Sequence, residues 1–370
     1  MQHKVTRAKI FFIILAIALL TLSCGKQKYP KGIYAKISTD KGMVVVFLEF
    51  EKVPMTVANF VGLVEGRIKN SALPEGKPYY DGSVFHRVVP NHVIQAGVPK
   101  GTDQSGPGYT FPNEIHPELR HSSAGVLGMA NAGPHTNGSQ FYITLSDRSY
   151  LDGDYTVFGH VVQGMDVVKS IVQGDKIESV RIMKIGRKPK EFRVDTDTFN
   201  NLVEQAKERV KKDEEKKMKE EAEIIDRNWP GAITSGSGVK YVVVKQGRGK
   251  KPQEGDPLKV MYTGKFLDGR MFYSSADEGK PVPDEPAQVF EFKVGKSTVN
   301  PGFDEALMDM GEGEKRIVII PSHLAYGIRG FYGREKKGTK RFVISPNTTL
   351  VYEIVLLDLI QPKIADRISK

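Results

Sequence analysis

Much of the chain alternates between apolar and polar side chains with a period of two, the pattern of β-strands with one buried face. Residues 33–50 alternate on both sides of an Asp-Lys-Gly sequence at 40–42, which predicts a β-hairpin. From 79 to 185, short β-type runs alternate with Gly-rich loops, as in all-β barrels and sandwiches. Residues 54–66 break this pattern, because a leading proline, helically spaced apolar residues and a final glycine predict a helix.

A long charged segment separates this region from the next. Residues 198–228 contain no glycine or proline, and the part from residue 212 to residue 223 is nearly all Lys and Glu. Apolar residues at helical spacing fill its first half: Phe199, Leu202, Val203, Ala206 and Val210. The segment therefore predicts a helix whose first half rests on a folded domain and whose second half is solvated. Trp229-Pro230-Gly231 ends it, and residues 234–238 form a flexible joint.

A second β pattern begins at residue 239 and ends with a strand at 348–360. One helix, from Phe303 to Met310, lies between its strands. The pattern predicts a small α+β unit of about 120 residues. No repeat relates it to the first region, so we expect two different folds.

Composition and charge place the chain among ordinary globular proteins. It has 370 residues, 39% hydrophobic and 26% charged, a length that suggests two or three domains. The formal net charge is +10, but basic and acidic residues are interspersed. Without a compact basic stripe, we expect no nucleic-acid partner, whereas an anionic membrane surface or acidic unfolded clients suit this charge.

The first residues predict export. A basic stretch at 1–9 precedes an apolar run at 10–22, which is shorter than the roughly 20 residues of a spanning helix. The only cysteine, Cys24, follows directly, so no intramolecular disulfide is possible. The arrangement resembles a bacterial lipoprotein signal, in which that cysteine is acylated, although Leu20 sits one place early. The alternative is a plain signal or an uncleaved anchor with an incidental cysteine.

We therefore expect a lipid-anchored protein of the bacterial cell envelope that faces the periplasm. The expected organisation is a signal peptide (1–23), a tether (24–31), a first domain (32–186), a charged helical linker (187–237) and a second domain (238–362).

Three motifs of the first domain resemble the cyclophilins. They are FHRVVPNHVIQAG (85–97), MANAGPHTNGSQFYI (129–143) and YLDGDYTVFGHVVQGMDVV (150–168), in the order and at the spacing of that family. The resemblance implies peptidyl-prolyl cis-trans isomerase activity. It also implies a closed eight-stranded β-barrel with two capping helices, which residues 54–66 and 164–172 fit.

The resemblance also implies the site. Rotating an X-Pro bond costs ~18–20 kcal/mol, and a catalyst must stabilise the twisted amide. Arg87 matches the family's catalytic arginine, which donates a hydrogen bond to the prolyl nitrogen. Three further residues match those that bind the substrate backbone or the arginine: Gln95, Asn131 and Gln140. The matched pocket walls are Val93, Ala130, Tyr142 and Leu151. His92, Tyr142, Tyr150 and Tyr155 replace the family's usual aromatic or histidine residues, so we expect a more polar pocket with altered selectivity.

The second domain resembles the FKBPs. The matching strings are VMYTGKFLDGRMFYSS (260–275), VFEFKVG (289–295), VNPGFDEALMDMGEGEKRIVIIPSHLAYG (299–327) and NTTLVYEIVLLDL (347–359). The resemblance implies a second isomerase domain, an antiparallel sheet wrapped on a short helix. Its aromatic cavity would be lined by Tyr262, Phe272, Phe290, Val299, Phe303, Tyr326 and Tyr352. The Tyr326 hydroxyl and the Asn300 backbone N–H match the donors to substrate carbonyls.

This second site departs further from its family. Tyr273 replaces the family's usual Asp, Asn300 its usual Ile and Phe303 its usual Trp. Residues 328–342 form a longer and more basic loop than is usual. That loop either receives acidic clients or is simply solvated. We favour the solvated loop.

We expect neither metal nor cofactor. The histidines match no ligand spacing and fit surface or core positions: His86, His92, His116, His121 and His135. The leading hypothesis is an isomerase with two sites that acts on exported unfolded or folding polypeptides containing X-Pro bonds. The alternatives are a holdase chaperone, in which the second pocket binds proline segments without turnover, and a structural lipoprotein.

Overall fold

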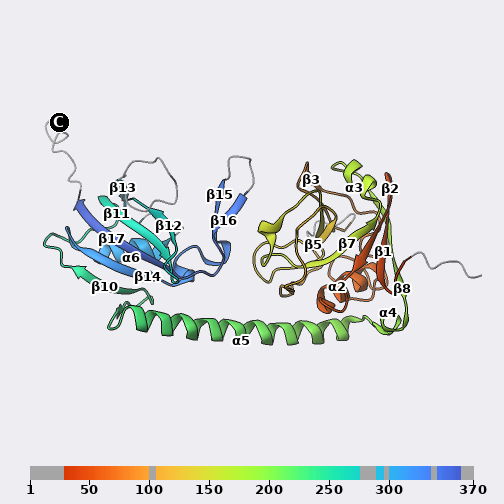
Figure 1. Ribbon diagram of the computed structural model, residues 1–370, viewed down its shortest axis with the longest axis horizontal. Helices are drawn as coiled ribbons and strands as arrows, with labels where there is room; N and C mark the ends of the chain where they lie inside the picture. Colours follow the sequence, from red (N-terminus) through yellow and green to blue (C-terminus); the bar gives the residue numbers. More distant parts are fainter. Residues whose placement is uncertain (1–28, 100–105, 276–288, 296–299, 335–339, 360–370) are drawn as a thin grey trace, which may run out of the picture.

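The computed structural model describes residues 29–99, 106–275, 289–295, 300–334 and 340–359. Two folded units lie at opposite ends of one long helix (Figure 1). The first unit begins with the antiparallel pair β1 (Gly32–Thr39) and β2 (Gly42–Leu48), which confirms the expected hairpin. Helix α2 (Pro54–Val64) follows with proline in its first turn, as predicted.

Eight strands form the sheet of the first unit, in the order β3-β4-β6-β5-β7-β2-β1-β8. The remaining strands are β3 (Arg87–Val89), β4 (Val93–Ala96), β5 (Val126–Met129), β6 (Phe141–Thr144), β7 (Val157–Gln163) and β8 (Ile177–Ile185). Three short helices complete the unit: η1 (Ser149–Leu151), α3 (Met165–Ser170) and α4 (Arg187–Glu191).

The expectation of a closed barrel is wrong in its detail. Strands β3 and β8 are the two edges of the sheet and do not pair with each other as strands. The segments that precede them are joined by an isolated bridge between Val84 and Lys176 and by backbone hydrogen bonds such as that from the Phe85 N–H to the Asp175 carbonyl at 2.9 Å. Because β3 has only three residues, it offers little backbone for a ladder with the nine-residue β8. The sheet is therefore a strongly curved, incompletely closed barrel.

Helix α5 (Thr196–Asn228) belongs to the core of the first unit as well as to the linker. It has 33 residues and so spans about 50 Å. Phe199, Val203 and Ala206 are buried in the same apolar cluster as α2 and the curved sheet. The Phe199 ring packs 5.5 Å from Tyr109 and 5.7 Å from Phe111, between ring centroids. The predicted helix and its buried first half are both confirmed.

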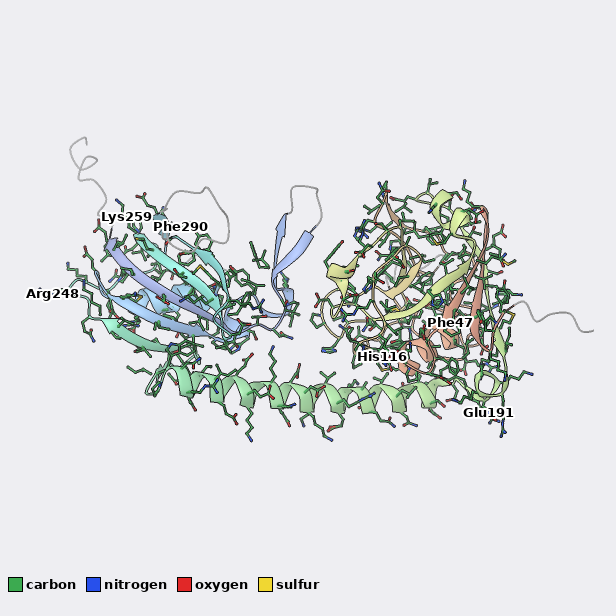
Figure 2. All side chains as sticks on the ribbon, viewed as in Figure 1. Phe47, His116, Glu191, Arg248, Lys259 and Phe290 are labelled. Atoms are coloured by element: carbon green, nitrogen blue, oxygen red, sulfur yellow. The ribbon has the colours of Figure 1, made fainter. Side chains whose placement is uncertain are left out.

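The far end of α5 is held by the second unit, a contact that the charge pattern did not predict. Ile225 is buried against Ile319 and Val351. Lys217 Nζ donates to the Asn347 carbonyl at 2.7 Å, and the Thr349 hydroxyl donates to the Glu221 carboxylate at 2.8 Å. Most side chains between these contact regions are exposed to solvent (Figure 2), whereas Arg209, Val210 and Asp213 line a cavity shared with both units.

The second unit is a curved antiparallel sheet around one short helix. Its main strand order is β12-β11-β17-β14-β10-β9, and β13 also pairs with β11. The strands are β9 (Ile233–Thr234), β10 (Lys240–Lys245), β11 (Pro257–Phe266), β12 (Met271–Ser274), β13 (Phe290–Lys293), β14 (Lys315–Ile320) and β17 (Leu350–Leu359). The helix is α6 (Pro301–Asp309), and Asn300 caps it by accepting from the Phe303 N–H.

The basic segment expected as a loop contains regular structure. It includes the short helix η3 (Gly327–Arg329) and a two-stranded hairpin of β15 (Phe331–Arg334) and β16 (Lys340–Ile344). In Figure 1 this hairpin stands on the side of the second unit that faces the first. A further short helix, η2 (Ser322–Leu324), precedes it. Among the described helices, none combines the length and apolar character needed to cross a bilayer.

Candidate active sites

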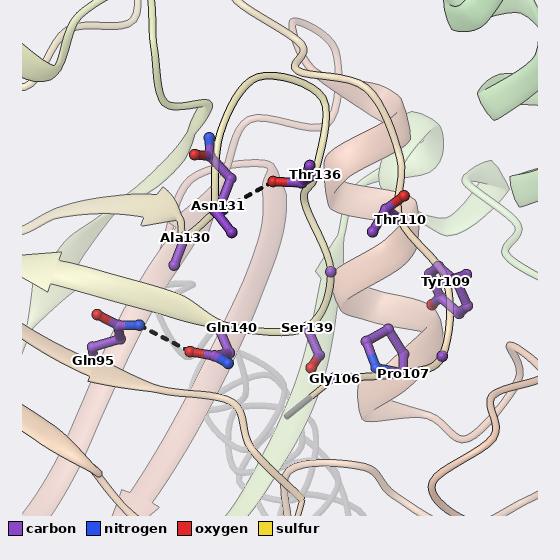
Figure 3. A pocket seen from close by; sticks show the side chains of 13 residues that line it. Gln95, Gly106, Pro107, Tyr109, Thr110, Ala130, Asn131, Thr136, Ser139 and Gln140 are labelled. Atoms are coloured by element: carbon purple, nitrogen blue, oxygen red, sulfur yellow. Dashed lines mark hydrogen bonds between the residues drawn. The ribbon is translucent and has the colours of Figure 1, made fainter. Parts of the chain in front are cut away.

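The first candidate site is a groove on the curved sheet of the first unit (Figure 3). Its cavity has a volume of about 710 Å³. Four of the predicted site residues line it: Gln95, Ala130, Asn131 and Gln140. They come from β4, from the segment after β5 and from the residue before β6, so the sheet brings distant motifs together.

Strand register places the predicted catalytic arginine. Arg87 on β3 lies directly opposite Gln95 on β4, and Gln95 lies opposite Tyr142 on β6. Side chains at directly opposed positions share one face of a sheet. Arg87 Nη1 donates to Gln95 Oε1 at 3.3 Å, and Gln95 Nε2 donates to Gln140 Oε1 at 2.9 Å. Two hydrogen bonds therefore link the exposed Arg87 guanidinium to Gln140, which lines the groove.

Asn131 has a side chain that is already engaged within the protein. Its Nδ2 donates to the Asp154 carbonyl at 3.0 Å, and its Oδ1 accepts from the Gly133 N–H at 3.2 Å. Asn131 thereby ties two loops of the groove together.

Tyr142 is part of a buried polar relay that the motifs did not reveal. Its hydroxyl lies 2.8 Å from His121 Nε2, and His121 Nδ1 lies 2.8 Å from Asp152 Oδ1. Burial lowers the pKa of His121 even though Asp152 opposes the shift, so the ring is neutral near pH 7. A carboxylate can only accept, so Nδ1 carries the proton and Nε2 accepts from the Tyr142 hydroxyl.

The relay engages the polar end of Tyr142 inside the protein. The His121 ring is fully buried and stacks on Tyr142 at 6.0 Å. Gly128 makes room for the phenol, because a Cβ there would overlap the Tyr142 ring. The Tyr142 hydroxyl is therefore already bonded within the protein, and the expectation of a more polar pocket stays a prediction. The sequence predicted a surface or core position for His121, and the structure places it in the core, whereas its partnership with Asp152 had no signal in the motifs.

Other predicted pocket residues contact one another but are not among those that line the cavity. The Tyr142 and Tyr155 rings are 6.1 Å apart, and the His92 and Tyr150 rings are 6.3 Å apart. Helix η1 carries Tyr150 and Leu151 together, and Val93 is buried in β4.

His92, whose ring lies near that of Tyr150, is neutral. Its Nδ1 accepts from Arg148 Nε at 2.9 Å. Burial, with the nearby charges of Arg148 and Arg87, lowers the pKa of His92 to about 4. The imidazole is therefore uncharged at neutral pH and adds no cation to the pocket.

The second candidate site is an aromatic cluster in the second unit, centred on Tyr262. The Tyr262 ring lies 5.4 Å from Phe290, 5.1 Å from Phe303 and 5.9 Å from Tyr352. Phe272 joins through Tyr352 at 5.8 Å. The predicted lining residues therefore do meet, except that Val299 falls outside the described residues.

Hydroxyl groups at this cluster are linked by hydrogen bonds. Asn300 Nδ2 donates to the Tyr352 hydroxyl at 3.0 Å, and the Tyr326 and Tyr352 hydroxyls also share a hydrogen bond. Burial raises the pKa of Tyr262, Tyr326 and Tyr352, so these phenols remain protonated at neutral pH. The substituted residue Tyr273 packs 4.9 Å from the Tyr262 ring and extends the aromatic wall.

Comparison with known proteins assigns both units. Residues 34–187 match the family described as cyclophilin type peptidyl-prolyl cis-trans isomerase/CLD, and residues 248–357 match FKBP-type peptidyl-prolyl cis-trans isomerase. A "Probable peptidyl-prolyl cis-trans isomerase A" of Mycobacterium leprae (strain TN) is 47% identical over 131 residues, which are 34% of this chain and 72% of the relative. "Peptidyl-prolyl cis-trans isomerase ppi1" of Schizosaccharomyces pombe is 43% identical over 158 residues, which are 40% of this chain and 95% of the relative.

Proposed function

Since the chain belongs to the peptidyl-prolyl cis-trans isomerases, with a cyclophilin-type and an FKBP-type domain in tandem, we propose that both sites act on exported, unfolded polypeptides while a lipid on Cys24 holds them at a membrane. The proposed catalysis is supported mainly by the chain of hydrogen bonds from Gln140 through Gln95 to the exposed Arg87.

The cyclophilin-type site favours the twisted amide through Arg87. Double-bond character in the amide sets a barrier of ~18–20 kcal/mol. As the bond twists, the prolyl nitrogen regains its lone pair and becomes a hydrogen-bond acceptor. A guanidinium already oriented by Gln95 stabilises that state more than the planar one, which lowers the barrier without cutting a bond.

The neighbouring wall suits a proline ring. His92 is neutral, and the hydroxyl of Tyr142 is bound to His121, so neither presents a charge to the substrate. The rings of Tyr150 and Tyr155 extend this wall. Proline binding by the apolar faces of these rings leaves Arg87 as the principal polar group beside the amide.

The FKBP-type site works mainly by removing water. Tyr262, Phe303 and Tyr352 form an aromatic wall in which the X-Pro amide loses solvent. The planar amide is more polar than the twisted one, so desolvation costs the ground state more. The protonated Tyr326 hydroxyl is a suitable donor to a substrate carbonyl.

A chymotrypsin-coupled isomerisation assay on the whole chain tests this function. Removing one transition-state donor typically costs about 10²–10³ in rate, so Arg87→Ala should reduce cyclophilin-type turnover by about that factor. Tyr326→Phe in the Arg87→Ala background should then reduce the residual FKBP-type turnover. Arg227→Ala, at an exposed position of α5, is the matched control and should retain wild-type turnover.

Two other results would replace the proposal. If Arg87→Ala keeps full turnover while Tyr326→Phe abolishes it, the cyclophilin-type site is inactive. If the wild-type chain shows no turnover but suppresses aggregation of an unfolded client, the protein is a holdase.

The membrane tether is supported by sequence features alone. The apolar run at 10–22 and the lone Cys24 lie outside the described residues. Stable anchoring takes more than one acyl chain, as a lipidated N-terminal cysteine would carry. Cys24→Ser should abolish incorporation of labelled palmitate and move the protein from the membrane to the soluble fraction. A variant that stays in the membrane fraction would point to an uncleaved anchor.

A further inference from the structure

A second cavity lies between the two domains, next to the groove of the cyclophilin-type site. Its volume is about 470 Å³. The cyclophilin-type domain contributes the segment 131–134 with Asp154 and Tyr155, and the FKBP-type domain contributes 328–330 and Pro346. Asn131 lines both this cavity and the groove that holds Gln95, so the two spaces adjoin.

The FKBP-type side of this cavity is fixed relative to the other domain. Helix α5 is rooted in the cyclophilin-type core through Phe199. From the same helix, Lys217 donates to the Asn347 carbonyl at 2.7 Å, and the Asn347 N–H donates to the Gly327 carbonyl at 2.9 Å. This chain of contacts reaches the residue just before Ile328.

The two domains also approach each other closely at the cavity. The Ile328 carbonyl oxygen is 3.7 Å from where a Cβ on Gly133 would stand. Gly133 follows Asn131 by two residues and has φ +138, a conformation that side chains rarely adopt. The backbone of the cyclophilin-type site thus passes directly beside the FKBP-type domain.

The lining of the cavity suits a polypeptide with an apolar side chain. Its apolar residues come from both domains and are Ala132, Pro134, Ile328 and Pro346. Ile328 is 60% exposed, and Arg329 and Asp154 lie beside it in the lining. Apolar residues that gather in one cavity with a polar rim, unlike single exposed ones, are typical of an interaction site.

We propose that this cavity receives client residues that flank the proline bound at Arg87, so that the FKBP-type domain forms part of the cyclophilin-type substrate site. The occupant is an extended polypeptide, because the cavity continues a groove whose ligand is a peptide and shares Asn131 with it. Ile328 contacts an apolar side chain of that client. The inference rests on the proposed function and names the substrate class of the same site.

The test compares two peptide substrates on the whole chain. The short one has four residues around a single X-Pro bond, and the long one adds flanking residues with a leucine scanned along both sides. The quantity measured is the ratio of kcat/KM for the long peptide to that for the short one. A client side chain that covers part of the exposed Ile328 should raise this ratio about fivefold, because apolar surface is removed from water. Ile328→Ser should remove that increase. Val244→Ser, at a 51% exposed apolar position on β10, is the matched control and should keep the wild-type ratio.

A second variant shows which domain generates the preference. In Arg87→Ala the remaining turnover belongs to the FKBP-type site, so the long-peptide preference should disappear. A preference that survives Arg87→Ala, or is unchanged in Ile328→Ser, would overturn the composite site. Failure of the proposed function looks different, because the wild-type chain would then turn over neither peptide.

Discussion

The substitution Phe199→Ala should destabilise the cyclophilin-type domain, although Phe199 lies beyond the segment that matches the family. Its side chain is 3% exposed and packs between Tyr109 and Phe111. Truncating a buried Phe to Ala costs about 3–5 kcal/mol, from lost transfer free energy and the cavity left behind. Domains have only about 5–15 kcal/mol in total, so the loss is a large share. For a domain of this size it corresponds to a fall in Tm of roughly 6–20 °C.

Differential scanning calorimetry of the whole chain measures this change, and fluorescence assigns the transitions. The only tryptophan, Trp229, packs against Ile225 at the FKBP-type end of α5. We therefore expect the transition seen by tryptophan fluorescence to keep its midpoint. The transition that abolishes Arg87-dependent turnover should move to lower temperature.

The matched control is Met218→Ala, which truncates a 70% exposed residue in the middle of the same helix. It should leave both transitions within about 1 °C, since exposed substitutions rarely change stability by more than ~0.5 kcal/mol. If Phe199→Ala behaves like Met218→Ala, then α5 is only a spacer and the reasoning is wrong.

Three further changes probe the cyclophilin-type site. Tyr142→Phe leaves the buried His121 Nε2 without its hydrogen-bond donor and should lower the free energy of unfolding, measured in urea, by about 1–3 kcal/mol. An unchanged unfolding midpoint would contradict the hydrogen bond between Tyr142 and His121. The pKa of His92 falls from 6.5 to about 4 on folding, so between these pH values the unfolded chain binds a proton that the folded chain does not. His92 should therefore lower the free energy of unfolding as the pH drops from 6.5 to about 4. His92→Phe should flatten the unfolding free energy over that window, and an unaltered slope would refute the assignment. Gln95→Ala frees the Arg87 side chain and should lower kcat/KM by about tenfold with little change in Tm, whereas a purely structural role would lower Tm instead.

Periodicity and motif order predicted much of this architecture. Helix α2 was visible from its leading proline and apolar spacing, and α5 from a long run without glycine or proline. The residues around Arg87 were identified by family motifs and meet because strand register aligns Arg87, Gln95 and Tyr142. In these cases local pattern and final structure agree.

The features that sequence reasoning missed depend on distant pairing. His121 and Asp152 are 31 residues apart and become partners only when burial brings the imidazole against Tyr142. Residues 328–342 were predicted to form a solvated loop because their basic composition gave no sign of the pairing between β15 and β16. The incomplete closure of the barrel likewise depends on the short length of β3, and the β-propensity of the sequence does not determine where a strand ends.

The solvated middle of α5 gives the molecule an unusual sensitivity to insertion. Each residue added there would lengthen the helix by about 1.5 Å and rotate everything beyond it by about 100°. One extra residue would therefore swing Ile328 away from Gly133, whereas seven would restore the facing direction after about two turns while opening a gap of about 10 Å. Relatives that keep both domains in this arrangement would tolerate many surface substitutions along the helix but few changes in its length.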